Sequence, residues 1–264
     1  MKTLKYTFII LGTALFLTSC EKEIDLDLDE SEQLFVVEGI VHDNLGDNYV
    51  LLTKTRPYSD NGEIEKVSNA SVQISDNLGN TSNLYEVAPG YYTDSTLQGI
   101  TNRTYNLVIN TEGKTITASS KMSPRVLIDS LSTDELTEAF WEDPNIPEYR
   151  ARCHFTDPAG TENFYRLKAF LDGEQEDGFL SIDDEFFDGI VTYFPIFEST
   201  FYQGDSVTIQ LLSIDEVNYR YFTALTASQG GQVPGNPITN LEGEDAVGYF
   251  GAYAKSEDSI VVTE

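Results

Sequence analysis

Cysteine, histidine, tryptophan and basic residues are scarce in this 264-residue chain. It holds two cysteines, two histidines, one tryptophan and 16 basic residues against 44 acidic ones. Two cysteines exclude a disulfide framework and any zinc or iron–sulfur site that needs several thiolates. The formal net charge of −28 argues against nucleic-acid binding, which requires clustered lysine and arginine to displace the counterions of phosphates. Two histidines leave almost no room for histidine-based catalysis.

Aromatic residues, in contrast, are plentiful. The chain has 15 tyrosines and 15 phenylalanines, too many for a disordered acidic chain. Its length allows two domains of ordinary size, each able to bury a core.

The first twenty residues predict an export signal and a lipid anchor. Lys2 and Lys5 precede a short apolar run at residues 6–17, and Leu17-Thr18-Ser19-Cys20 follows. The apolar run is too short to span a bilayer, which takes about 20 residues, so it is typical of a signal peptide at residues 1–19. Ser19-Cys20 favours a lipobox, in which the Cys20 thiol takes up diacylglycerol and the chain is cut before it. The alternative is an ordinary signal peptide with an incidental cysteine.

Processing before Cys20 would leave a membrane-tethered chain. Two or three acyl chains anchor a protein to a membrane essentially permanently, whereas a single chain anchors it only marginally. The cut removes two lysines and makes the net charge −30. Cys153 would then be the sole free thiol, and we expect it to be a buried small apolar residue.

Residues 20–32 form a predicted acidic tether. The sequence after Cys20 is EKEIDLDLDE, which would be repelled from anionic headgroups and extended. Its alternation of acidic and apolar residues is also compatible with a short strand. Acids directly after a lipidated cysteine resemble the signal that sends Bacteroidota lipoproteins to the cell surface, so we expect surface exposure.

The mature chain is predicted to be mostly β. Short alternating runs separated by turns every 8–12 residues indicate an Ig-like or prealbumin-like β-sandwich at residues 33–122. We expect His42 in a turn of this domain. The expected strands are residues 34–41, 49–55, 71–75, 81–87, 91–94, 103–110 and 115–120.

A second antiparallel β-domain is expected at residues 123–264, after a polar boundary at residues 129–138. One helix is predicted at residues 215–229: Asp215 can cap it, Val217, Tyr221 and Leu225 share a face, and Gly230-Gly231 ends it. Two glycines in GYFGAYA indicate a bulge or a close backbone approach. The strands expected here are residues 150–156, 163–171, 190–197, 207–214 and 248–254.

Several short motifs together resemble a Bacteroidota family of domain-of-unknown-function lipoproteins. They stand in order along nearly the whole mature chain, and residues 125–205 contribute least. The motifs are CEKEIDLDLDE, LFVVEGIV, YVLLTKTRPY, NYRYF at residues 218–222, GNP at 235–237, NL at 240–241 and GYFGAY at 248–253.

The resemblance implies a cellular location and a partner, but no catalytic reaction. Members of this family are outer-membrane lipoproteins often encoded beside TonB-dependent receptors, and they supply no catalytic residues to carry over. The chain is therefore expected to be a non-enzymatic, lipid-anchored outer-membrane protein on the cell-surface side. Its role would be to assist a TonB-dependent receptor or to capture an unknown small ligand for it. The alternatives are a structural or adhesive surface lipoprotein and, less favoured, a glycan or peptide hydrolase.

The residues themselves favour a non-enzymatic role. Cys153 and His154 are adjacent on a predicted strand and so point to opposite faces, which prevents a dyad. Glycoside hydrolysis needs a pair of carboxylates, but among 44 acids such a pair carries no information. Trp141 is the single tryptophan of the chain, whereas a carbohydrate-binding cleft usually has several aromatic side chains on which sugar rings stack.

Two acidic loops could supply oxygen ligands for a structural calcium ion. They are residues 172–177 and Asp183-Asp184-Glu185. The first departs from the EF-hand pattern because Asp177 stands where a glycine is required. The competing interpretation is two solvated acidic loops, and no other cofactor is expected.

Two further features concern the surface. Seven aromatic residues lie between positions 186 and 202, and core packing is the favoured explanation over an exposed docking patch. Four Asp-Ser/Thr-type sequences resemble the O-glycosylation acceptor of this phylum, although Asp-Ser is also ordinary turn chemistry. The aromatic residues are Phe186, Phe187, Tyr193, Phe194, Phe197, Phe201 and Tyr202, and the acceptor serines are Ser95, Ser130, Ser206 and Ser259.

Overall fold

Strands make up most of the chain, which confirms the mostly-β prediction. The computed structural model describes residues 33–57, 62–137, 143, 146–176, 178, 180–197, 199–229, 237–243 and 245–263. Within them lie sixteen strands and one helix. The predicted signal peptide, Cys20, the acidic tether, Trp141, Asp177 and the Gly230-Gly231 pair lie outside these residues.

All seven strands expected in residues 33–122 are present, with bounds that differ from the expected ones by a residue or two. His42, expected in a turn, is instead the last residue of its strand and pairs with Tyr253. The strands are β1 (Phe35–His42), β2 (Tyr49–Lys54), β3 (Ser71–Asp76), β4 (Thr81–Ala88), β5 (Tyr91–Thr93), β6 (Thr104–Thr111) and β7 (Lys114–Lys121).

The remainder of the chain adds nine strands and the helix. The polar segment expected as a boundary is strand β8, because Ile128 and Leu131 pack on the core while its serines point outward. The elements are β8 (Ile128–Glu135), β9 (Tyr149–Thr156), β10 (Phe164–Leu171), β11 (Glu174–Gln175), β12 (Leu180–Asp183), β13 (Val191–Pro195), β14 (Ser206–Ile214), α2 (Glu216–Gln229), β15 (Leu241–Glu242) and β16 (Ala246–Val261).

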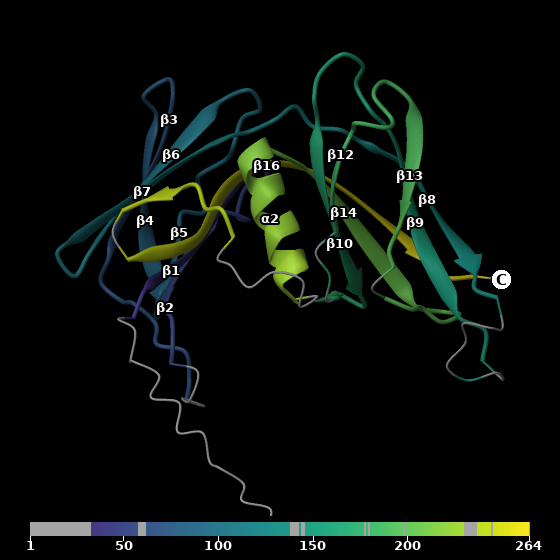
Figure 1. Cartoon of the computed structure of the whole chain (residues 1–264), viewed down its shortest axis with the longest axis horizontal. Helices are drawn as coiled ribbons and strands as arrows, with labels where there is room; N and C mark the ends of the chain where they lie inside the picture. The colour runs from purple at the N-terminus through teal and green to yellow at the C-terminus, as the bar shows by residue number, and fades with distance from the viewer. Residues whose placement is uncertain are drawn as a thin grey trace, which may run out of the picture. The chain divides into compact units, whose positions relative to one another are not determined.

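The long strand β16 joins the two parts of the larger sheet, β10 and β14 on one side and β1–β7 on the other (Figure 1). It pairs in parallel with β1 and antiparallel with β14. The larger sheet runs β11-β10-β14-β16-β1-β2-β5-β4-β3-β6-β7-β15, with β12 also on β10, and a smaller sheet runs β13-β9-β8. The strands of both predicted domains are thus joined, and a division at residue 122 stays a prediction.

Two main cores fill the space between strands. The first lies among β1–β7 and the first half of β16, and it includes Leu107 and Phe250. The second lies between the three-stranded sheet and the sheet formed by β10, β14 and the end of β16. It includes Phe155, Tyr165 and Leu211, and these two layers give the second part of the chain its sandwich character.

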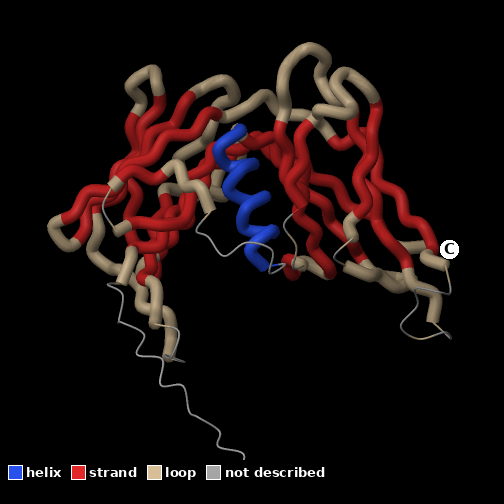
Figure 2. Tube along the Cα trace, in the orientation of Figure 1, coloured by secondary structure: helices blue, strands red, loops and turns tan. Residues whose placement is uncertain are grey.

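Helix α2, blue in Figure 2, packs against a third apolar cluster. Its cap is as predicted: the Asp215 carboxylate accepts a hydrogen bond from the Asn218 backbone N–H at 3.0 Å. The predicted face is confirmed for Tyr221 and Leu225, which pack against this cluster, but Val217 is exposed, and Asn218 and Phe222 are the fully buried residues of the helix. No helix in the described ranges is long and apolar enough to cross a membrane.

The glycines of β16 provide the close backbone approach that the sequence indicated. Gly248 has φ of +109°, and a Cβ there would overlap the carbonyl oxygen of Val37 on the neighbouring strand. A Cβ at Gly251 would overlap the Tyr253 ring. Gly248 thus permits the close backbone approach of β1 and β16, whereas Gly251 makes room for the ring of Tyr253 on its own strand.

Candidate functional site

The aromatic residues between positions 186 and 202 divide between the core and the surface. Phe187 and Phe201 are buried, and Phe194 is half-buried against the same core. Four others are exposed, and among the described residues only one further aromatic, Tyr85, is counted as exposed. Their exposed fractions are 86% for Phe186, 50% for Tyr193, 60% for Phe197 and 38% for Tyr202. Some of these aromatic residues therefore pack in the core, as favoured from the sequence, and others are exposed.

Strand alternation determines which side chains reach the surface. On β13, Thr192 and Phe194 face the core, while Val191 and Tyr193 face outward. On the neighbouring β9, Cys153 and Phe155 are fully buried, while Arg150, Arg152 and His154 are partly exposed. The outward side chains of the two strands therefore share one face of the three-stranded sheet.

Two arginines lie over two of the exposed rings. The Arg152 guanidinium is 4.8 Å from the centroid of the Tyr193 ring, and that of Arg150 is 4.8 Å from the centroid of the Phe197 ring. Each arrangement is a cation–π contact. We call Arg150, Arg152, Val191, Tyr193 and Phe197 the aromatic–arginine face. Tyrosine and arginine are the residue types most often decisive in protein interfaces.

The two arginines of the aromatic–arginine face differ in their ion pairs. Arg152 forms an ion pair with Asp134 of β8. Arg150 has no ion pair with any residue that the structure describes, and its buried Nε lacks a hydrogen-bond partner there. A hollow of about 190 Å³ beside these groups is lined by Asp134, Glu135, Leu136, Thr137, Arg150 and Arg152.

Neither histidine belongs to a nucleophile–histidine–carboxylate triad among the described residues. His42 is buried, and burial, together with the positive charges of Lys255 and Lys168, lowers its pKa to about 4. His154 Nε2 lies 2.8 Å from the hydroxyl of Ser132. Cys153 is fully buried as expected, and burial raises the pKa of its thiol to about 12. It is therefore an inert core residue, and it points away from His154.

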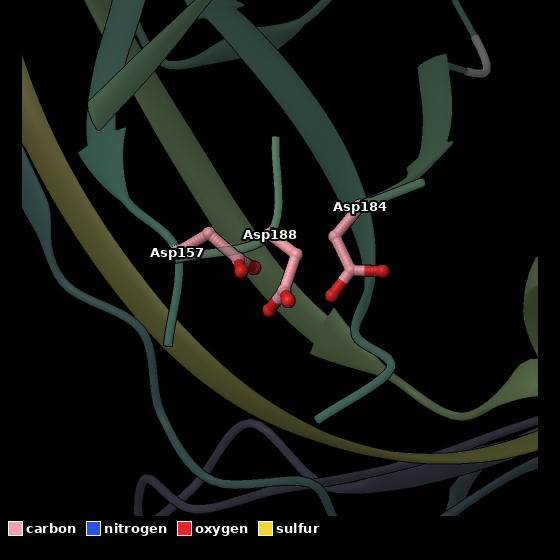
Figure 3. Close-up of side chains that lie close together, drawn as sticks. All are labelled: Asp157, Asp184 and Asp188. Carbon is pink, nitrogen blue, oxygen red and sulfur yellow. The ribbon is translucent and has the colours of Figure 1, made fainter. Parts of the chain in front are cut away.

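Three aspartates converge from two loops (Figure 3). Carboxylate oxygens of Asp157, Asp184 and Asp188 lie within 4.8 Å of one another, and the first two residues are buried. Of the predicted calcium loops, only Asp184 takes part. Asp157 and Asp188 were not predicted, because they come from separate loops and carry no spacing signal.

Hydrogen bonds from neighbouring residues hold the three carboxylates of this cluster in place. Asp157 accepts bonds from the Tyr165 hydroxyl and from Gly189 N at 2.9 Å. Asp184 accepts one from Asn163 N at 2.9 Å, and Asp188 one from Gly160 N at 2.7 Å. The carboxylates thus fix the loops around them. Carboxylate oxygens could also serve a hard cation, but the geometry does not require one.

The other residues of the predicted calcium loops are elsewhere. Asp172 and Gly173 form the turn between β10 and β11, both with positive φ. Asp183 accepts a hydrogen bond from the Tyr219 hydroxyl at 2.7 Å and so ties β12 to α2. The loop at residues 172–177 lies partly outside the described residues.

A cavity of about 460 Å³ opens at one end of the first core, beside Asp76, Asp94 and Arg103. Burial alone would raise the pKa of Asp76, but hydrogen bonds from Asn80 and Arg103 outweigh it and hold the pKa at about 2. The Ser82 hydroxyl and Thr96 hold the pKa of Asp94 below its usual range. Both carboxylates are ionised, and each already accepts hydrogen bonds from neighbouring residues of the chain.

All four predicted acceptor serines are exposed. Ser95 lies in the turn after β5, Ser130 on β8, Ser206 at the start of β14 and Ser259 near the end of β16. The Ser259 hydroxyl is 2.8 Å from that of Thr208. Their O-glycosylation stays a prediction.

Comparisons with known proteins give a family but no activity. Among solved structures, a two fibronectin type-III domain segment from chicken tenascin is similar at 13% identity, covering 67% of this chain and 88% of that chain. Its TM-score is 0.23, too low to support an argument. No curated protein matches. The family model described as "Domain of unknown function (DUF4249)" matches residues 21–259, and the chain therefore belongs to that family.

Proposed function

We propose that this chain is an outer-membrane lipoprotein, anchored through Cys20 and exposed on the cell surface, that binds a partner without catalysis. The partner would be a TonB-dependent receptor, which the chain would assist or supply with a captured small ligand. The single observation that carries the binding role is the aromatic–arginine face. It concentrates exposed Tyr193 and Phe197 beside two arginines on a regular sheet.

The sequence before the described residues supports the anchor. The lipobox ends at Cys20, and the family match begins at residue 21, which fits a cut before Cys20. Acyl chains confine a protein to two dimensions beside its membrane partner and raise the effective concentration of each for the other. The acidic residues after Cys20 add reach, so weak contacts at the aromatic–arginine face would suffice.

A hydrolase is less well supported. Cys153 is buried with its thiol protonated, and His42 is enclosed in the fold. The converging aspartates are hydrogen-bonded to their own loops. A structural or adhesive surface role remains the main competing proposal. It differs in requiring no receptor and no small ligand.

Acylation tests the anchor. Cells producing the full chain are labelled with an alkyne-bearing palmitate analogue, and we expect label on the wild type and on Cys153→Ser but none on Cys20→Ser. Cys153→Ser is the matched control because it removes the other cysteine. Equal labelling of Cys20→Ser, or its unchanged membrane attachment, would contradict the anchor. Protease shaving of intact cells then tests exposure, and complete protection would place the chain on the periplasmic side.

Co-purification tests the partner. The chain is isolated from native membranes in mild detergent, and a TonB-dependent receptor is expected to elute with it. The double variant Tyr193→Ser/Phe197→Ser should lose the receptor, while Tyr85→Ser, an exposed tyrosine on β4, should keep it. Elution of the wild-type chain alone at every detergent strength would rule out the receptor and favour the adhesive alternative.

A further inference from the structure

Strand β13 differs from the other sheet edges. In the described part of the chain, β11 and β15 have two residues each, β12 ends in Asp183, and β8 carries three acidic residues. Short length and charge are the usual ways in which proteins stop an edge from pairing. β13 has neither, and its only protective feature of this kind is Pro195 at its end: residues 189–197 read GIVTYFPIF, without one charged residue in a chain with 44 acids.

The backbone of β13 leaves hydrogen-bonding groups free on its outer side. Asp157 N donates to Ile190 O at 3.2 Å, and Ile196 N donates to Ala151 O at 2.9 Å. Since the bonds of an antiparallel pair alternate, the even-numbered residues face β9. The N–H and C=O groups of Val191 and Tyr193 therefore face away from it. They have no backbone partner among the residues described, and Pro195, which lacks an N–H, limits this free stretch.

Side chains beside these free groups are exposed and apolar. Val191 is 70% exposed and Tyr193 half exposed. A strand added along this edge would place its own side chains about 5 Å from theirs and would cover them. Strand addition of this kind draws its affinity from the main chain and its selectivity from alternate side chains.

The arginines indicate the charge of the added segment. Both lie beside β13, since their guanidinium groups are over the rings of Tyr193 and Phe197, and Arg152 also pairs with Asp134 of β8 on the other side of β9. Arg150 forms no ion pair with the described residues, so it can receive a carboxylate at little cost in lost contacts. A second copy of this chain fits poorly, because its own β13 offers no carboxylate and two copies with a net charge of −28 each repel one another.

We propose that the open edge of β13 binds an extended, carboxylate-bearing segment of a partner protein as an added strand, with Arg150 receiving an acidic side chain. This deepens the proposed function, since it rests on the binding role of the same face. It is tested separately from the anchor and the receptor, because the measurements below use purified mature chain in detergent and synthetic peptides.

The probe is an octapeptide that alternates valine and glutamate, with a fluorescein label on its N-terminus and an amidated C-terminus. Its binding is followed by fluorescence anisotropy, with the alternating valine–lysine peptide as control. We expect the glutamate peptide to bind and the lysine peptide to bind at least about tenfold more weakly. Methylating the backbone nitrogens of one alternate set of residues should abolish binding. Methylating the other set should leave it, because only one set faces β13.

Two pairs of protein variants locate the site. Val191→Pro removes an N–H that faces the open edge, where proline is tolerated, and should weaken binding at least about tenfold relative to Val191→Ala. Arg150→Gln should weaken it similarly, while Arg220→Gln, an exposed arginine on α2, should have no effect. Should Val191→Pro misfold by near-UV circular dichroism, the methylated peptides still decide between strand addition and simple side-chain contact.

Several results would overturn the proposal. They are equal binding of the glutamate and lysine peptides, insensitivity to both methylation patterns, and equal effects of Arg150→Gln and Arg220→Gln. A dimer in sedimentation that Val191→Pro converts to monomer would mean that a second copy occupies the edge. Each of these outcomes leaves the acylation and receptor tests untouched, so the two proposals fail independently.

Discussion

At the scale of single residues, His42 and Gly248 show when a local sequence signal predicts the environment of a side chain and when it does not. His42 was expected in a turn because Asp43 and Asn44 follow it, yet it is buried against Tyr253, with ring centroids 5.9 Å apart. The long-range pairing of β1 with β16 encloses it, and no local pattern signals such pairing. Gly248 is the opposite case, because the glycine itself indicated the close approach that the structure shows.

The buried His42 makes stability depend on pH. The unfolded chain takes up a proton on this imidazole near pH 6.5, but the folded chain takes it up only at about pH 4. The stability due to the neutral ring is therefore lost as the pH falls from 6.5 towards 4. Relative to His42→Phe, which lacks this titration, the wild type should lose about 2 kcal/mol of unfolding free energy between pH 7 and pH 5. Urea unfolding at both pH values measures this, and an unchanged difference would contradict the lowered pKa.

Gly248→Ala should be severely destabilising. Its φ of +109° disfavours any side chain, and the new Cβ would overlap the Val37 carbonyl. We expect a loss of more than about 3 kcal/mol. The matched control is Gly46→Ala, which also has positive φ (+86°) but no atom within 4 Å of the new Cβ, and it should cost about 1–2 kcal/mol. Equal losses in urea unfolding would mean that the backbone conformation, not the contact with β1, decides the cost.

Whole strands and helices were predictable to the extent that their signal is local. Alternation identified strands such as β3 and β6, in which buried and more exposed residues take turns, and a continuous apolar, β-branched run identified β1. β8 was missed because its outward residues are serine and aspartate, which are also typical of linkers. On α2 only Val217 was misplaced, because the polar Asn218 is buried instead: it donates to Phe250 O at 3.1 Å and accepts from the Tyr253 hydroxyl at 2.8 Å.

The candidate site was predictable only in part for the same reason. The aromatic residues between positions 186 and 202 stand close together in the sequence, so their concentration was visible. Arg150 and Arg152 join them through the register of β9 against β13, in which Tyr193 lies opposite His154 and Pro195 opposite Arg152. Register between distant strands cannot be read from either strand alone.

The cap of α2 should contribute more than a helix cap usually does. Besides Asn218 N, the Asp215 carboxylate accepts hydrogen bonds from the Ser120 hydroxyl at 2.6 Å and from Lys121 N at 3.2 Å, so it joins the helix to β7. Asp215→Ala should cost about 2–3 kcal/mol in thermal or urea unfolding. The neighbouring Glu216→Ala, which breaks only an exposed pair with Arg220, should cost less than about 0.5 kcal/mol. Similar costs for the two variants would show that the contact with β7 adds nothing.

At the scale of the whole chain, a strand from the C-terminal end, β16, takes part in the sheet and the core of residues 33–122. The sequence suggests two domains in succession, because the turns and strands of residues 33–122 look complete by themselves. The structure gives β1 a neighbour from the other end of the chain: all eight of its residues pair with β16. Phe250 and Ala252 of β16 also belong to the first core. The first sandwich thus takes part of its sheet and of its core from residues beyond 245.

A fragment of residues 20–122 tests whether the first predicted domain is independent. Without β16, one edge of β1 would be unpaired, and the places of Phe250 and Ala252 in the first core would be empty. Buried phenylalanine alone is worth about 2–3 kcal/mol, a large part of the stability of a domain of this size. We therefore expect the fragment to lack dispersed amide resonances and cooperative urea unfolding. Adding a synthetic peptide of residues 245–264 should restore both, because it supplies the missing strand. A fragment that folds cooperatively without the peptide would establish an independent domain, and β16 would then be an addition to a complete sandwich.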